Sequence, residues 1–240
     1  MAGKVAREIS QRGVKIKIKP DNSPVSDGDI AVDKILTSKI KDLTPNIPVI
    51  SEETVNLDVE NKNKNFWLID PIDGTREYIK NKDEYTLNAA LILDLEPVIG
   101  IIYAPAKERL FFSYGVNNAF EIKKEKMISL KCNKANNKEV IGLQHSGSTP
   151  IEVLDIYKEN NVSKMLRMSS SLKFCIIAAG EADIYAAKAR AFEWDIAAGH
   201  AILKHAGGIV TDLKNEKFLY GKVGYKNISL IAKRSLNLKK

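Results

Sequence analysis

Two carboxylates three residues apart directly follow an apolar run, in a segment suited to bind metal and phosphate. The segment reads Asp70-Pro71-Ile72-Asp73-Gly74-Thr75 and comes after Phe66-Trp67-Leu68-Ile69. Pro71 fixes its own φ and restrains Asp70, so the two acids stand in a stiff turn. Gly74 permits close approach of the backbone, and free N–H groups at a helix start bind anions. Two hard oxygen ligands beside an anion cradle suit metal-assisted phosphate chemistry.

Two more acidic segments stand where such a site needs ligands. Ser51-Glu52-Glu53 follows a β-like run over residues 47–50, at the strand end where open α/β sheets bind ligands. Asp195 stands where a helix should begin, ahead of Ala, Ile and Leu at helical spacing. In a plainer interpretation, Asp70 and Asp195 cap helices and the other carboxylates are solvated. Each segment taken alone leaves both interpretations open.

Taken together and in this order, the three segments resemble the inositol monophosphatase superfamily of magnesium-dependent, lithium-sensitive phosphatases. Within it, the chain is most similar to the bacterial 3′(2′),5′-bisphosphate nucleotidase branch, the CysQ type. The similarity extends in the family's order over nearly all 240 residues, through 21–26, 43–49, 76–80, 85–88, 103–105 and 170–175. The resemblance implies an α/β (α+β) fold, the layered α/β/α/β/α sandwich of the inositol monophosphatase/fructose-1,6-bisphosphatase type.

The resemblance also implies a centre of two or three Mg²⁺ ions. Its ligands would be Glu52, Asp70, the backbone carbonyl of Ile72, Asp73 and Asp195. Paired metals about 4 Å apart would neutralise the phosphate, lower the pKa of a bound water and stabilise the leaving oxygen. No protein nucleophile is then required.

Catalytic and phosphate-binding contacts follow from the same resemblance. Asp70 would bridge two metals, while Glu52 and Thr75 would position and activate the water. The amides of Gly74 and Thr75 would bind phosphate. Asp29 matches an acidic residue that lies near a weaker metal in the family.

Substrate selection is implied for the second half of the chain. The substrate-binding residues there would be His145 near the nucleotide, Lys173 toward a second phosphate, and Ser169 and Asp195 beside them. Without the resemblance, His145 is a surface or core residue and Lys173 a solvated lysine at a helix start.

Several positions on the substrate side depart from the family's pattern. Ser169 stands for the usual Gly, and its Cβ would crowd a ligand if its φ were positive. Ala187 replaces an Arg that would pair with phosphate. Ala189 and Ile196 replace Gly and Thr, and the N-terminal helix is shorter than in the family. The implied metal ligands are all in place.

Apolar periodicity and turn residues predict the elements that hold these residues. We expect helices over 2–11 and 27–41, and between them a strand over 14–19 with one buried face and one solvated lysine face. Strands are expected near 47–50, 65–69, 86–93, 97–103 and 108–114. Beyond them, strands at 139–143, 164–168, 183–187 and 208–211 alternate with helices at 149–160, 171–180 and 195–206. The polar stretch 131–138 would separate a metal- and phosphate-binding half, 1–132, from a substrate-selecting α/β half, 133–240, within one continuous phosphatase unit.

Composition indicates which partners and which cellular location to expect for the protein. The chain of 240 residues carries a net charge of +7, but its lysines are scattered, without a nucleic-acid-binding motif. A basic balance suits a small polyanionic substrate through electrostatic steering. The start lacks a secretory pattern and no apolar stretch is long enough to span a membrane, so we expect a cytoplasmic protein. Peripheral association at the cytoplasmic face of the inner membrane and the oligomeric state are left open.

The expected function is magnesium-dependent removal of the 3′-phosphate from 3′-phosphoadenosine 5′-phosphate, giving AMP and phosphate in sulfur and nucleotide metabolism. An inositol or sugar monophosphatase is the alternative enzyme, because the metal core would be shared. A catalytically decayed nucleotide-binding protein is the alternative from another class.

Overall fold

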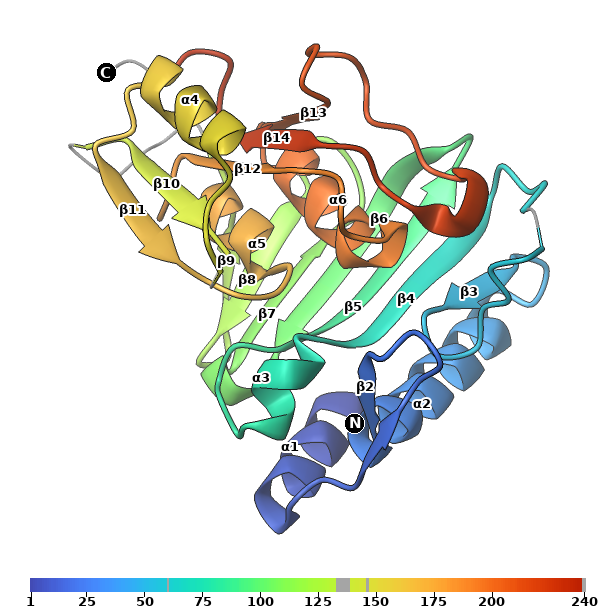
Figure 1. Cartoon of the computed structure of the whole chain (residues 1–240). Helices are drawn as coiled ribbons and strands as arrows, with labels where there is room; N and C mark the ends of the chain where they lie inside the picture. Colours follow the sequence, from blue (N-terminus) through green and yellow to red (C-terminus); the bar gives the residue numbers. More distant parts are fainter. Residues whose placement is uncertain (60, 133–138, 146, 239–240) are drawn as a thin grey trace.

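A seven-stranded sheet forms one layer of the molecule (Figure 1). The computed structural model describes residues 1–59, 61–132, 139–145 and 147–238. Neighbouring strands are antiparallel except the first two, which are parallel. In spatial order the strands are β3 (Val49–Ser51), β4 (Phe66–Asp73), β5 (Thr86–Leu93), β6 (Glu96–Ala104), β7 (Arg109–Ser113), β8 (Ala119–Lys123) and β9 (Lys126–Ser129).

A five-stranded sheet forms a second layer, and it mixes parallel and antiparallel pairs. Its strands in spatial order are β11 (Lys164–Arg167), β10 (Ile141–Gln144), β12 (Ile184–Ala187), β14 (Leu230–Lys233) and β13 (Ile209–Thr211). Two helices, α5 (Leu172–Ala178) and α6 (Ala197–His205), lie between the sheets, and α4 (Ile151–Glu159) covers the far face of the smaller one (Figure 1).

The outer face of the larger sheet carries α1 (Ala2–Arg12) and α2 (Asp27–Leu43) (Figure 1). Ser26 starts α2 with a capping box, because its hydroxyl accepts from the amide of Asp29 while the Asp29 carboxylate accepts from the amide of Ser26 at 2.8 Å. A cap of this kind stabilises a helix by about 1 kcal/mol. It also fixes Asp29 at the helix start, and Asp29 is 1% exposed.

The inner layer can pack tightly because glycines stand at its closest contacts. A Cβ added to Gly100 of β6 would lie 2.3 Å from the carbonyl oxygen of Ala198 in α6. A Cβ on Gly199 would lie 2.6 Å from the Phe174 side chain of α5. The 3₁₀ helix η2 (Glu193–Asp195) leads directly into α6. The close approach of α6 to β6 therefore sets where Asp195 lies.

The expected layered α/β/α/β/α sandwich is confirmed, with the layers α1 and α2, larger sheet, α5 and α6, smaller sheet, and α4. The strands of the larger sheet end at Ser129 and those of the smaller sheet begin at Ile141. The proposed boundary stretch 131–138 lies mostly outside the described residues, so the division at residue 132 stays a prediction. The sequence did not indicate β8, β9 or β14. The helix start expected after Asp73 is present as α3 (Thr75–Ile79), whereas η1 (Pro105–Lys107) and η3 (Val223–Tyr225) were not indicated.

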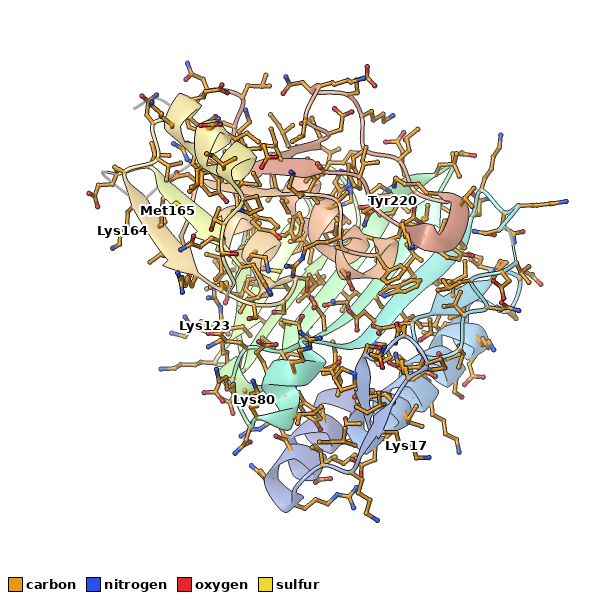
Figure 2. The ribbon with its side chains drawn as sticks, in the orientation of Figure 1. Lys17, Lys80, Lys123, Lys164, Met165 and Tyr220 are labelled. Carbon is orange, nitrogen blue, oxygen red and sulfur yellow. The ribbon has the colours of Figure 1, made fainter. Side chains whose placement is uncertain are left out.

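The Lys-alternating segment differs from its prediction. It contains β1 (Ile16–Ile18), which pairs only with β2 (Pro24–Ser26) and stands outside both large sheets. No layer covers this ribbon, so Ile16 and Ile18 are 48% and 66% exposed and the expected buried face is wrong. The lysines labelled in Figure 2 lie apart around the outside of the molecule: Lys17, Lys80, Lys123 and Lys164.

Candidate active site

Three carboxylates from distant parts of the chain meet at one edge of the larger sheet. Oxygen atoms of Glu52, Asp70 and Asp195 all lie within 4.8 Å of one another. Glu52 directly follows β3, Asp70 lies within β4, and Asp195 ends η2. Because β3 and β4 are parallel neighbours, their carboxyl ends meet at the same edge. This arrangement brings together three of the four acidic side chains implied as metal ligands.

Strand β4 carries Asp70 and Asp73 out of the core to this edge. Asp70 pairs with Asn88 of β5 and Asp73 with Thr86, and the register shifts between the two pairs. Pro71 has no N–H for the ladder and suits such an irregular position. The second carboxylate accepts a hydrogen bond from the backbone amide of Ser171, at the start of α5. Asp73 is thereby tied to the inner helical layer as well as to the strand.

Asp195 does not cap the helix that follows it, because α6 begins at Ala197 with Ile196 as its N-cap and has no side-chain cap. One carboxylate oxygen accepts from the amide of Phe192 at 2.8 Å, which caps η2. The same side chain belongs to the acidic group with Glu52 and Asp70. The cap therefore holds the carboxylate in place toward the other two acids.

One oxygen atom of the acidic group is buried without a hydrogen-bond partner among the described residues. Asp70 is 1% exposed, and its Oδ1 atom has no hydrogen-bond partner among the described residues. Burial, and then the neighbouring carboxylates, raise the pKa of Asp70 well above its ordinary value and that of Asp195 to about 8. An orphaned carboxylate oxygen amid like charges is costly unless a cation binds there. The residues present therefore fit a divalent metal bound by hard oxygen ligands.

Lys19, directly after β1, contacts Glu52 of the acidic group. Its place among alternating lysines did not single it out. Its ammonium lies 3.1 Å from a Glu52 oxygen and 2.9 Å from a Glu53 oxygen. Although burial lowers the pKa of Lys19, the two carboxylates raise it to about 12. The expectation of a wholly solvated lysine face is therefore wrong for Lys19, whose carboxylate partners come from a loop more than thirty residues away.

The turn after β4 is shaped by Gly74 and Thr75. Gly74 has φ 95°, and a Cβ there would lie 2.8 Å from the carbonyl oxygen of Glu84. The expected close approach of backbone at Gly74 is thus confirmed. The Thr75 hydroxyl lies 3.1 Å from Asp29 Oδ1 and 3.0 Å from the carbonyl oxygen of Ile72. The hydroxyl proton of Thr75 can therefore be donated to either of these two oxygen atoms, one at a time.

A cleft opens from the acidic group toward the smaller sheet. The cavity that includes Asp73 and Asp195 has an empty volume of about 540 Å³, part of it open to solvent. An adjoining cavity of about 450 Å³ shares five lining residues with it: His145, Tyr185, Ala187, Lys188 and Arg190. The two cavities thus form one cleft with carboxylates at one end and cations along its wall.

The residues expected on the substrate side take different places. His145 lines both cavities, and burial, followed by the charge of Arg190, lowers its pKa. Lys173 also lines the cleft but is only 5% exposed, so the interpretation of a solvated lysine is wrong. Ser169 is 1% exposed and does not line the cleft, whereas Ser170 and Ser171 do. The positive φ, 59°, belongs to Ser170 and not to Ser169.

A much larger cavity lies away from this chemistry. It has an empty volume of about 2190 Å³, part of it open to solvent, and is bounded by α1, α2 and the outer face of the larger sheet, including Ile101 and Leu110. Its lining is mainly apolar and does not include Glu52, Asp70 or Asp195. Size alone therefore does not identify the active site, and the convergent carboxylates do.

The inositol monophosphatase family profile matches residues 1–237. The chain therefore belongs to the inositol monophosphatase family, a metal-dependent family. The layered fold and the acidic group described above agree with this membership. Among the described residues, no helix is both long and apolar enough to cross a membrane.

Within this family, the chain is similar to proteins named CysQ. The chain is 40% identical over 203 residues to the 3′(2′),5′-bisphosphate nucleotidase CysQ of Buchnera aphidicola, covering 84% of this chain and 76% of that protein. It is 36% identical over 204 residues to the CysQ of Salmonella typhimurium, covering 84% and 81%. The crystal structure of CysQ from Bacteroides thetaiotaomicron matches with a TM-score of 0.81 at 29% identity, covering 100% of this chain and 94% of that one.

Proposed function

We propose that this protein is a magnesium-dependent 3′(2′),5′-bisphosphate nucleotidase, which converts 3′-phosphoadenosine 5′-phosphate to AMP and phosphate. One observation carries the proposal: the partly buried acidic group, which fits divalent metal, opens into a cleft with cations along its wall. A substrate with two phosphates satisfies both ends of such a cleft. The names of the relatives support the same reaction.

The ligands proposed for two or three Mg²⁺ ions are Glu52, Asp70, the carbonyl of Ile72, Asp73 and Asp195. Magnesium bound there would neutralise the phosphate, lower the pKa of a water and stabilise the leaving oxygen. The fit is supported by the orphaned Oδ1 atom of Asp70 and the raised pKa of Asp195.

The chain's own groups orient the reactants. We assign Glu52 and the Thr75 hydroxyl to the attacking water, because Asp29 fixes the hydroxyl at 3.1 Å and so orients its lone pairs. The amides of Gly74 and Thr75 are assigned to the phosphate that leaves. His145 lies at the junction of the two cavities and is assigned to the nucleoside. The resemblance places Lys173 toward the second phosphate, and in this cleft its charge contributes to the wall.

The proposed setting is the cytoplasm, where a soluble nucleoside bisphosphate would reach the cleft. The net charge of +7 would steer such a polyanion toward the protein. Peripheral contact with the inner membrane and the oligomeric state do not enter the proposed reaction.

The test is phosphate release from three substrates in the presence of magnesium: 3′-phosphoadenosine 5′-phosphate, adenosine 3′-monophosphate and inositol 1-phosphate. We expect the bisphosphate to give the highest kcat/KM, because only it engages both ends of the cleft. Chelation of magnesium should stop all release. Preference for inositol 1-phosphate would establish the alternative monophosphatase, and release from none of the three would favour a nucleotide-binding protein without catalysis.

A further inference from the structure

Four positively charged or titratable side chains line the cleft beyond the acidic group: His145, Lys173, Lys188 and Arg190. Their availability for an anion differs, because two of the cations are already engaged. The Lys173 ammonium donates to the backbone carbonyl of Ser170 and lies 5.0 Å from the centre of the Tyr185 ring. Lys188 forms an ion pair with Glu152 of α4. An anion would have to compete with these contacts.

Arg190 differs from both lysines. Its side chain is exposed, and within the described part of the chain it makes no hydrogen bond or ion pair. It nevertheless lines both cavities, so it faces the cleft where they join. The guanidinium stays charged at any ordinary pH and can bind phosphate through two parallel hydrogen bonds.

Burial brings a second difference between Arg190 and Lys173. Burial lowers the pKa of Lys173 to about 8, and although Asp73 opposes this shift, Arg190 adds to it. The charge of Arg190 also lowers the pKa of His145. Arg190 is therefore near enough to both residues to influence them electrostatically, which places its charge inside the same cleft.

The backbone that carries Arg190 is anchored on both sides. The amide of Ala189 donates to the Ser229 hydroxyl at 3.1 Å, and the carbonyl of Ala191 accepts from the amide of Asn227 at 3.0 Å. The Asn227 side chain further donates to the carbonyl of Phe192 at 2.7 Å. This anchored segment continues into η2 and ends at Asp195, five residues after Arg190. One short segment thus carries both a metal-end carboxylate and a free cation.

We propose that Arg190 is the residue that directly binds the second phosphate of the substrate and so determines preference for nucleoside bisphosphates over monophosphates. The inference rests on the proposed nucleotidase function and deepens it. Lys173 then supports the cleft wall from beneath Ser170, and its charge is a general contribution. Because Arg190 and Asp195 stand on one anchored segment, the backbone of that segment fixes the spacing between the two phosphate-binding ends of the cleft.

The experiment compares Arg190→Ala, Arg190→Lys and Lys173→Ala with the unmodified enzyme on two substrates. Arg190→Ala should lower kcat/KM for 3′-phosphoadenosine 5′-phosphate by about ten- to a hundredfold, mainly through KM, because a charge-assisted contact is lost. It should leave adenosine 3′-monophosphate unchanged within about twofold. Arg190→Lys should retain part of the preference. Lys173→Ala should slow both substrates by a common factor.

The matched control is Arg167→Ala, which removes the same charge from an exposed position on β11 that does not line the cleft. It should leave both substrates unchanged. An Arg190→Ala enzyme that loses both substrates equally, or neither, would overturn the proposal. So would a bisphosphate-selective loss in Lys173→Ala alone.

A binding measurement separates this inference from the proposed reaction. Isothermal titration calorimetry measures the affinities for AMP and for adenosine, which differ only in the retained 5′-phosphate. The unmodified protein should bind AMP more tightly than adenosine, and Arg190→Ala should remove most of that difference. Equal affinities in the unmodified protein would overturn the role of Arg190. An unmodified protein that releases no phosphate but prefers AMP would instead contradict the nucleotidase function and retain the phosphate-binding role.

Discussion

The two ends of the cleft are built in opposite ways. At the acidic end, the carboxylates are buried or partly buried and are held by strand register, a helical cap and the sheet edge. At the cationic end, Arg190 is exposed on the segment between β12 and η2. A buried, fixed group resists change because each member constrains the others. An exposed side chain on a connecting segment can be replaced without disturbing the core.

We therefore expect turnover and substrate selectivity to depend on different ends of the cleft. Changes at the acidic end should act on turnover, through the charge of the metal centre. Changes at the cationic end should act on the choice between substrates, as the Arg190 experiment tests. The further predictions concern the acidic end and run from the largest expected effect to the smallest.

The largest effect is expected from Asp195→Asn. The substitution keeps the size of the side chain and removes one charge from the proposed metal centre, so kcat should fall by about a thousandfold or more. Circular dichroism should show an unchanged fold. Asp155→Asn on the exposed face of α4 is the control and should keep full turnover. Near-normal turnover in Asp195→Asn would mean that Asp195 serves only as the cap of η2.

A second effect concerns stability without metal. Burial and the other carboxylates hold the pKa of Asp195 at about 8, against 3.8 ordinarily. Between these values the folded protein binds a proton that the unfolded chain has released, so the free energy of unfolding falls as pH rises. Tm without magnesium should therefore be lower at about pH 8 than at about pH 5, and added magnesium should raise it more at the higher pH.

Asp70→Asn sharpens this stability measurement. With one charge fewer in the acidic group, the metal-free protein should lose less Tm between the two pH values. Its response to magnesium should be reduced as well, because a proposed ligand is gone. Differential scanning fluorimetry measures both quantities. A magnesium response equal to that of the unmodified protein would show that the cation binds elsewhere.

The smallest effect is expected from Lys19→Met. The ammonium partners Glu52 and Glu53, so its loss should lower the metal-free Tm by about 2–5 °C. The increase in Tm on adding magnesium should become larger, because more negative charge is left to neutralise. Lys17→Met, on the exposed ribbon, is the matched control and should change neither value (Figure 2). Equal behaviour of the two variants would show that the Lys19 contacts contribute no net stability.

At the acidic end the sequence marks three carboxylate segments, but their meeting in one site was implied by the family resemblance, because each segment alone also fits a helix cap or a solvated loop. A carboxylate pair directly after an apolar strand and a second pair after its neighbour define a sheet edge, and Asp195 opens a recognisable helix. The layered architecture was not contained in periodicity and came from the family resemblance. The hairpin of β8 and β9 escaped prediction because β9 is exposed along its whole length and has no apolar face.

The cationic end was predicted less well because its contacts depend on tertiary structure. Without the family resemblance Lys173 is expected to be a solvated lysine, yet it is buried, since α5 lies between the two sheets. Arg190 has no motif of its own, and only the folding of its segment against Asn227 and Ser229 brings it to the cleft. Lys19 belongs to an alternating pattern that indicates a wet surface, yet it reaches carboxylates of a distant loop.

The pairing of strand β4 with β5 determines on which face of the sheet the Asp70 side chain lies. Phe66 and Leu68 belong to the core between the sheets, and Asp70 continues the same alternation. Trp67 belongs to the apolar cluster on the side of α2. A slip of one residue in the pairing with β5 would therefore turn Asp70 toward the wrong side of the sheet. An insertion in the segment between β4 and β5, which contains α3, could leave the apolar core largely paired and still misplace Asp70, so activity would report strand alignment before stability does.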